Sequence, residues 1–292
     1  ISEVQRKFMT TVKSGNVFNL AIKGSFDDCQ NIIKKIFSDD YYKKSNYLTA
    51  INSINWSRIM CQMVYYFYTM SRLETNGKKV LFSVPTGNFG DILAGYISTK
   101  MGLKIDMFNI ATNENDILTR TLMSGKHELR KVKETSSPSI DIQISSNFER
   151  LLYDITKNTD YVNNLMAELK ETGKYTLEEK ELSKMRETFC SYSVSEKEAG
   201  ELIKETFRKY GIIVDPHTAV GLVSANKCEK KYDLQVTLST AHPAKFKDTV
   251  FDLIDNEKFI TDKVHNIMKL EEDMIILDND IDIVKNFITE NI

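Results

Sequence analysis

Apolar and polar positions alternate along the chain in a way that predicts strands followed by helices. Residues 80–84 form an apolar segment of strand length, and apolar side chains then recur at helical spacing at Ile92, Leu93, Tyr96 and Ile97. Between them lies the turn Pro85-Thr86-Gly87-Asn88-Phe89-Gly90-Asp91. The sequence therefore predicts a strand that enters a helix through a glycine-containing turn.

The same order of elements recurs along the chain. Strands are predicted at residues 17–23, 105–110 and 234–238, and helices from Ser25 to about 37, at 113–124, 166–172, 177–188 and 196–210. Residues 39–45 are predicted to be a polar connection. The longest helix is predicted from Trp56 to about Asn76, closed by Gly77, and its all-round apolar character favours burial. Such alternation is typical of βαβ units with a parallel sheet, whose ligands bind beyond the carboxyl ends of the strands.

The glycine turn is the strongest candidate for a binding site. Its two glycines allow a sharp bend and a close approach to a ligand, and the first amides of the following helix have no partner within the helix. A turn of this kind favours phosphate.

Other polar residues allow two interpretations. Asn52 and Asn55 precede the longest helix and are either caps or ligand-binding residues. His217 is either a general base or, more commonly for this position, a hydrogen-bonded structural residue at the start of a helix that Asp215 caps. Hydroxyl groups after the last strand, at Ser239 and Thr240, suggest contact with a polar group there.

Composition narrows the class of ligand. The chain has 292 residues, of which 41% are hydrophobic, so it can form one large or two medium domains. A net charge of -2 gives no electrostatic reason to expect nucleic acid or a membrane as a partner, which leaves a small molecule. The four cysteines lack metal-site spacing and are expected to be reduced thiols, and no signal peptide or membrane span is recognisable, so we expect a cytoplasmic protein without a metal.

Seven segments, taken in order, resemble those of the threonine synthases, which depend on pyridoxal 5'-phosphate (PLP) and belong to the tryptophan synthase β-like, fold type II, group. The segments are GSFDDCQ (24–30), NSINWSRI (52–59), PTGNFGDILAGY (85–96), IATNENDIL (110–118), SSNFERLLYD (145–154), DPHTAVG (215–221) and LSTAHPAKF (238–246). The resemblance implies an α/β fold with a three-layer parallel sheet. It also implies that residues 1–46 are the remainder of a small domain, and that residues 47–292 are a large cofactor-binding domain with a helical insertion near 147–190.

The resemblance also assigns residues to a site. It implies that the amides of Gly87, Asn88, Phe89 and Gly90 hold the cofactor phosphate. The hydroxyl of Thr240 would contact the pyridine nitrogen of the cofactor, with Ser239 as the alternative if the alignment is shifted by one. Candidates for contact with the substrate phosphate are Asn55, Arg58 and Lys245.

The implied reaction converts O-phospho-L-homoserine and water to L-threonine and phosphate, the last step of threonine biosynthesis. The Schiff-base lysine of the family lies in a segment of the type PTxAFKD, upstream of all the matched segments, and this sequence contains no such segment. Because the chain also begins with Ile1, we expect it to be the portion of a threonine synthase after that lysine, with no catalytic residue of its own and no turnover. Two alternatives are a related phospholyase, and a non-catalytic remnant that binds a phosphate ligand or a protein.

Overall fold

The computed structural model describes residues 3–291, apart from the side chains of Phe26 and Asp27. Two compact units are found: Ile51–Glu257 form the larger one, and the residues up to Ala50 together with those from Lys258 form the smaller one. The elements of the larger unit are α4 (Trp56–Arg72), β2 (Val80–Pro85), α5 (Gly90–Lys100), β3 (Met107–Thr112), α6 (Ile117–Ser124), β4 (Lys126–Glu128), the 3-10 helix η1 (Pro138–Ile140), α7 (Phe148–Thr156), α8 (Thr159–Thr172), β5 (Lys174–Thr176), α9 (Glu179–Thr188), β6 (Phe189–Ser193), α10 (Glu196–Tyr210), α11 (Pro216–Asn226), β7 (Leu234–Thr237), the 3-10 helix η2 (Pro243–Phe246) and α12 (Lys247–Ile254).

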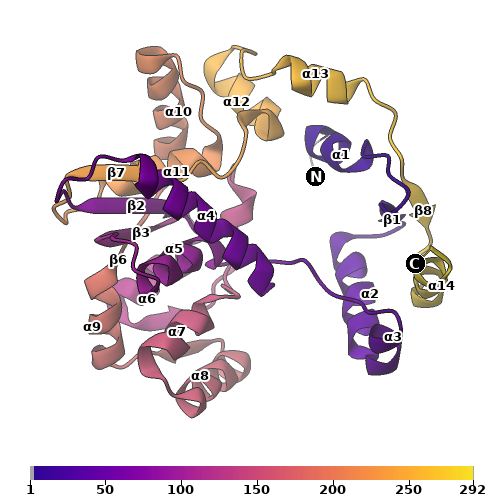
Figure 1. Cartoon of the computed structure of the whole chain (residues 1–292), viewed down its shortest axis with the longest axis horizontal. Helices are drawn as coiled ribbons and strands as arrows, with labels where there is room; N and C mark the ends of the chain where they lie inside the picture. The colour runs from indigo at the N-terminus through magenta and orange to yellow at the C-terminus, as the bar shows by residue number, and fades with distance from the viewer. Residues whose placement is uncertain (1–2, 292) are drawn as a thin grey trace. The chain divides into compact units, whose positions relative to one another are not determined.

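A four-stranded sheet in the order β6-β3-β2-β7 is the centre of the larger unit (Figure 1). All three of its strand pairs are parallel, with Phe82 opposite Phe108 and Val236. The central strand β2 is buried at every position, as expected for a strand covered on both faces. The predicted parallel α/β fold is confirmed.

Helices cover both faces of this sheet. Phe82 and Val84 belong to a core cluster that also contains the buried side chains of α4 and α5. On the other face, Leu81 packs with Ala225 of α11, and the Ser83 hydroxyl donates a hydrogen bond to the Gly221 carbonyl at 2.6 Å. The predicted three-layer arrangement is therefore found, because alternate residues of one strand enter different layers.

Strand β6 lies where no strand is predicted from the sequence. Phe189–Ser193 overlaps the end of the predicted helical insertion, yet it is an edge strand of the main sheet, with Phe189 opposite Phe108. The rest of that region contains α7, α8 and α9, and also the short strand β5, which pairs antiparallel with β4. The prediction failed here because β6 follows α9 directly and no turn residue separates them.

Helix α4 departs from its prediction in two ways. It ends at Arg72, and Gly77, with φ of 82°, lies in a separate turn before β2 and does not cap the helix. It is also not buried all round: Ile59, Met63 and Tyr66 face the core, whereas other large apolar side chains are exposed, including Trp56, Met60, Val64, Tyr65 and Tyr68. Only the residues at helical spacing on one face contact the sheet layer.

The smaller unit is held together by pairing between its two chain segments. Its elements are α1 (Glu3–Thr10), β1 (Leu20–Ile22), α2 (Phe26–Ser38), α3 (Asp40–Ser45), α13 (Asp262–Met268), β8 (Ile275–Leu277) and α14 (Ile281–Asn291). Strand β1 pairs with β8 in parallel, and Ile32, Ile36 and Val284 form a small core. Helix α2 begins with a capping box formed by Ser25 and Asp28. The predicted polar connection at 39–45 is instead the short helix α3, because the Asp39 side chain caps it by accepting from the Tyr42 amide at 2.9 Å.

The division into units differs from the predicted domains at one end of the chain. The predicted boundary after residue 46 lies close to the observed one after Ala50. The segment from Lys258 onward was predicted to belong to the large domain, but it contributes α13, β8 and α14 to the smaller unit. Short strands such as β8 carry too few residues for their partner to be read from the sequence.

Candidate functional site

The turn between β2 and α5 is anchored by an aromatic side chain. Phe89 is the N-cap of α5 and has a left-handed conformation, with φ of 58° and ψ of 8°. Its buried ring packs against Phe148 and Phe189, with centroid separations of 5.3 and 6.0 Å. A left-handed conformation costs a non-glycine residue about 1–3 kcal/mol, and burial of the ring offsets this cost.

The carbonyls and the amides of the turn have opposite environments. Gly87 O accepts from Ser145 Oγ at 2.7 Å, and Asn88 O accepts from Asn147 Nδ2 at 2.8 Å. Within residues 3–291, no acceptor is found for the main-chain N–H groups of Gly87, Asn88 and Phe89. Consecutive free amides beside a left-handed residue at a helix N-terminus form a concave anion site, and the helix dipole strengthens it.

The two glycines of the turn do not provide the sharp bend that was predicted for them. Neither Gly87 nor Gly90 has a positive φ, so the sharp bend comes from Phe89. A Cβ at Gly87 would lie 2.4 Å from the Ser139 carbonyl oxygen, which leaves no room for any side chain. A Cβ at Gly90 would meet nothing closer than 3.6 Å. Gly87 is therefore required for close packing, and Gly90 is not.

His217 contacts Ser139, which packs against the turn, and both of its ring nitrogens have hydrogen-bond partners. Its buried ring places Nδ1 at 3.0 Å from Asp215 Oδ1, and its Nε2 accepts from the Ser139 amide at 3.1 Å. Because an amide can only donate, the ring hydrogen is on Nδ1. The structural interpretation of His217 is confirmed: it holds Ser139, whose carbonyl packs over Gly87.

The loop after β7 begins at the carboxyl ends of the strands, the same end of the sheet as this turn. The Leu238 amide donates to Ser83 O at 3.0 Å, which continues the pairing of β7 with β2 to the carboxyl end. Ser239 and Thr240 follow and are exposed, with Ser239 Oγ accepting from Thr218 Oγ1 at 3.3 Å. The structure thus brings Thr240 to the edge where the glycine turn lies.

The three substrate candidates lie on two elements, α4 and η2. Asn55 caps α4, its side chain accepting from the Ser57 amide at 2.8 Å, and Arg58 is exposed one turn further on. Gln62 Oε1, on the same face of α4 as Arg58, lies 3.6 Å from where a Cβ of Gly90 would be. Lys245 lies in η2, after the loop that follows β7.

Asp91, in the first turn of α5, is a half-buried acid. Burial raises the pKa of its carboxyl group to about 6, and the hydrogen bond from the Tyr66 hydroxyl, at 3.2 Å, opposes this shift. The same hydroxyl donates to the Asp91 carbonyl at 2.9 Å. The start of α5 is therefore fixed to α4 by the Tyr66 side chain.

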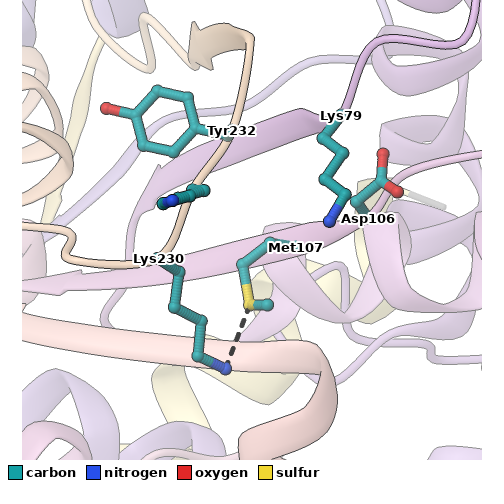
Figure 2. A pocket seen from close by; sticks show the side chains of 6 residues that line it. Lys79, Asp106, Met107, Lys230 and Tyr232 are labelled. Carbon is teal, nitrogen blue, oxygen red and sulfur yellow. Dashed lines mark hydrogen bonds between the residues drawn. The ribbon is translucent and has the colours of Figure 1, made fainter.

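A cavity of about 350 Å³ lies at the opposite edge of the sheet (Figure 2). It is lined by residues that precede β2, β3 and β7 or begin β3, namely Lys79, Asp106, Met107, Lys230, Lys231 and Tyr232. In Figure 2 the Lys230 side chain reaches Met107, whose sulfur lies 3.7 Å from its Nζ. Because parallel sheets bind ligands at their carboxyl ends, this cavity at the amino ends is not the candidate site.

Two kinds of site are not found in the described part of the chain. No group of three or more histidine, cysteine, aspartate or glutamate residues there is arranged to hold a metal ion. No helix among the same residues is long and apolar enough to cross a membrane.

The curated relatives and the most similar solved structures are threonine synthases. The family model described as "Threonine synthase, C-terminal" matches residues 218–288. The threonine synthases of Pseudomonas aeruginosa and Saccharomyces cerevisiae are 41% and 42% identical to the chain and cover all of it, whereas the chain covers 63% and 62% of them. The crystal structure of PLP-bound threonine synthase from Brucella melitensis matches with a TM-score of 0.94 at 43% identity, covering all of this chain and 63% of that one. The yeast enzyme structure matches with a TM-score of 0.90.

The fold and its turn at the carboxyl edge of the sheet define an α/β protein of the fold type II class, the class of these solved threonine synthases. Along its whole length the chain is homologous to threonine synthases, so the predicted resemblance to that family is confirmed. It spans about 63% of the length of the relatives that it matches.

Proposed function

We propose that the chain is the cofactor-holding part of a threonine synthase, with PLP bound at the glycine turn. The observation that carries this proposal is the turn itself, where the N–H groups of Gly87, Asn88 and Phe89 lack acceptors among the described residues while the Gly87 and Asn88 carbonyls are occupied. With the first helical amide, at Gly90, these groups fit a phosphate. The absence of room for a Cβ at Gly87 supports a main-chain cradle.

Thr240 would lie at the other end of the cofactor ring. It follows β7, the strand beside β2, so its hydroxyl is at the same edge as the phosphate cradle. A hydroxyl contact leaves the pyridine nitrogen largely unprotonated, in contrast to a carboxylate contact. When bound, PLP would supply an electron sink for deprotonation of an amino-acid substrate.

The substrate we propose is O-phospho-L-homoserine, which with water gives L-threonine and phosphate. Arg58 and Lys245 supply positive charge for the substrate phosphate, and Asn55 supplies an amide at the start of α4. The approach of Gln62 and of the Ser53 carbonyl to Gly90 supports this assignment, because it places the N-terminal turns of α4 beside the cofactor cradle. We place the reaction in the cytoplasm, and residues 1–46 in the remainder of a small domain.

This chain would bind the cofactor without turning over substrate. It contains no segment of the type PTxAFKD, so no lysine in it corresponds to the one that forms the Schiff base in the family. Its residues would hold and orient the cofactor, and a lysine elsewhere in a complete enzyme would move the protons.

Two measurements test the proposal. The protein expressed from its complete gene should convert O-phospho-L-homoserine to threonine and phosphate in equal amounts, whereas 2-oxobutyrate as the product would identify a phospholyase. Borohydride reduction of the given chain with PLP, followed by mass analysis, should yield no adduct confined to one lysine. A single specific adduct would contradict the assignment of the covalent lysine to a segment outside this sequence.

A further inference from the structure

The segment Ser145-Ser146-Asn147 contacts the glycine turn through every one of its side chains. Ser145 Oγ donates to Gly87 O at 2.7 Å, and Ser146 Oγ lies 3.1 Å from Asn88 Oδ1. Asn147 Nδ2 donates to Asn88 O at 2.8 Å, and the Asn147 main-chain amide donates to the same oxygen at 3.2 Å. The segment immediately precedes α7 and lies 58 residues from the turn in sequence.

Asn147 also joins the turn to residues 52–55. It is fully buried, and its Nδ2 donates a second hydrogen bond, to Ser53 O at 2.8 Å. Its Oδ1 accepts from Arg150 Nη1 at 3.0 Å, while Arg150 Nη2 donates to Ile54 O at 2.8 Å. The side-chain amide of Asn147 therefore uses both of its donor hydrogens on main-chain carbonyls from two different segments.

These contacts fix the direction of the free amides because a peptide group is planar and trans. The Gly87 carbonyl and the Asn88 N–H belong to one peptide plane and point in opposite directions, as do the Asn88 carbonyl and the Phe89 N–H. When Ser145 holds the first carbonyl and Asn147 holds the second, the two N–H groups must face away from residues 145–147. A released carbonyl could rotate outward and present a negative dipole to an anion.

We propose that Ser145 and Asn147 are positioning residues that hold the anion cradle in its binding conformation and connect it to residues 52–55. This inference rests on the proposed function, because it assigns the cradle to the cofactor phosphate. Asn147 donates to both the Asn88 carbonyl in the cradle and the Ser53 carbonyl before α4. An anion that stabilises the cradle therefore also stabilises the position of Ser53, so the start of α4 is ordered together with the cradle.

The test compares two ligands that differ only in the phosphate. Pyridoxamine 5'-phosphate and pyridoxamine do not form imines with lysines, and their affinities for the whole 292-residue chain can be measured by calorimetry. Asn147→Asp places a carboxylate oxygen against the carbonyl oxygens of Asn88 and Ser53. It should lower the affinity for the phosphorylated ligand by about 30-fold or more. Ser145→Ala removes one hydrogen bond and should lower the affinity for the phosphorylated ligand by about 3- to 10-fold. Both variants should bind pyridoxamine as the unmodified chain does.

The matched control is Asn158→Asp, which makes the same chemical change at the N-cap of α8. Asn158 accepts from the Tyr161 amide at 3.1 Å, and aspartate caps a helix equally well, so this variant should keep the preference for the phosphorylated ligand. Ser145→Thr keeps the hydroxyl and should restore most of the affinity that Ser145→Ala loses. If Asn147→Asp does not fold, the pair of Ser145 variants decides: loss in alanine with recovery in threonine supports the inference, and equal affinity in both overturns it.

The outcomes separate this inference from the proposed function. A preference for the phosphorylated ligand that persists in both Asn147→Asp and Ser145→Ala overturns the positioning role and leaves the proposed function intact. An unmodified chain that binds both ligands equally overturns the phosphate role of the turn, and with it the role of residues 145–147.

Discussion

The turn after β2 and the loop after β7 leave the same edge of the sheet but are built in opposite ways. The turn is defined by its main chain: its carbonyls are held by Ser145 and Asn147, and Phe89 anchors it in the core. The loop is defined by exposed side chains, Ser239 and Thr240, with one hydrogen bond at 3.3 Å to Ser239.

This difference predicts two kinds of sensitivity. A main-chain cradle tolerates changes of side chain but not an added atom where the packing is closest, as at Gly87. A hydroxyl contact from an exposed loop contributes about 0.5–1.5 kcal/mol and can be removed without disturbing the fold. Substitutions in the turn should therefore affect recognition of phosphate strongly, and those in the loop should affect recognition of the ring weakly.

The largest effect is expected from Gly87→Ala. The new Cβ would lie 2.4 Å from the Ser139 main-chain oxygen, so one of the two segments must move. Overpacking of this kind costs about 1–3 kcal/mol, and the upper end of that range weakens binding about 100-fold. The affinity for pyridoxamine 5'-phosphate, measured by calorimetry, should fall accordingly, while that for pyridoxamine should not.

Gly90→Ala is the control for the same turn. Its Cβ would have contacts of 3.6 Å or longer and its φ is not positive, so affinity for the phosphorylated ligand should stay within about threefold of the unmodified chain. Equal losses in the Gly87 and Gly90 variants would show that glycine acts through flexibility, and the close packing against Ser139 would then not explain the site.

The sequence predicted the place of this turn but not its construction. A strand, a turn with two glycines and a helix are adjacent in the sequence, so local periodicity was sufficient to find them. The left-handed residue is Phe89, a conformation paid for by its contacts with Phe148 and Phe189, which are distant in sequence. Ser145 and Asn147 carry no local signal for the same reason, since their partners lie 58 and 59 residues away.

A second effect concerns the pH dependence of stability at the start of α5. The pKa of Asp91 is raised from 3.8 to about 6 by burial, so between these values the folded chain keeps a proton that the unfolded chain has released. The free energy of unfolding therefore falls as pH rises from 4 to 6, by about 2 kcal/mol for a shift of this size. Asp91→Asn cannot ionise and still accepts from Tyr66, so it should lack this decrease.

The comparison should be made as a difference between the two proteins at each pH, from urea unfolding curves. His127 acts in the opposite direction, because burial lowers its pKa to about 4 and the folded state loses stability as pH falls below 6.5. It is present in both proteins and cancels in the difference. A difference that stays constant from pH 4 to pH 7 would contradict a raised pKa for Asp91.

The strands that the local sequence pattern does not predict are those defined by pairing with distant strands. Strand β6 is recognisable as a strand because β3 pairs with it, and β8 because β1 does. Helix α4 shows the reverse case: its apolar positions were read as evidence of burial, but of its described side chains only Ile59, Met63 and Tyr66 are buried, and Met70 packs, partly buried, against the same core. Hydrophobic periodicity shows which face of a helix is buried, but not how much of the helix surface other elements cover.

The smallest effect is expected in the loop after β7. Thr240→Val keeps the shape of the side chain and removes the hydroxyl proposed to contact the cofactor ring, so affinity should fall by about 2- to 10-fold. Because the contact is with the ring, pyridoxamine and its phosphate should be weakened equally, in contrast to Gly87→Ala. Ser239→Ala should leave both affinities unchanged. A loss of affinity only in Ser239→Ala would assign the ring contact to Ser239. A loss of affinity confined to the phosphorylated ligand would mean that the loop contacts the phosphate, and the contrast between the turn and the loop would not hold.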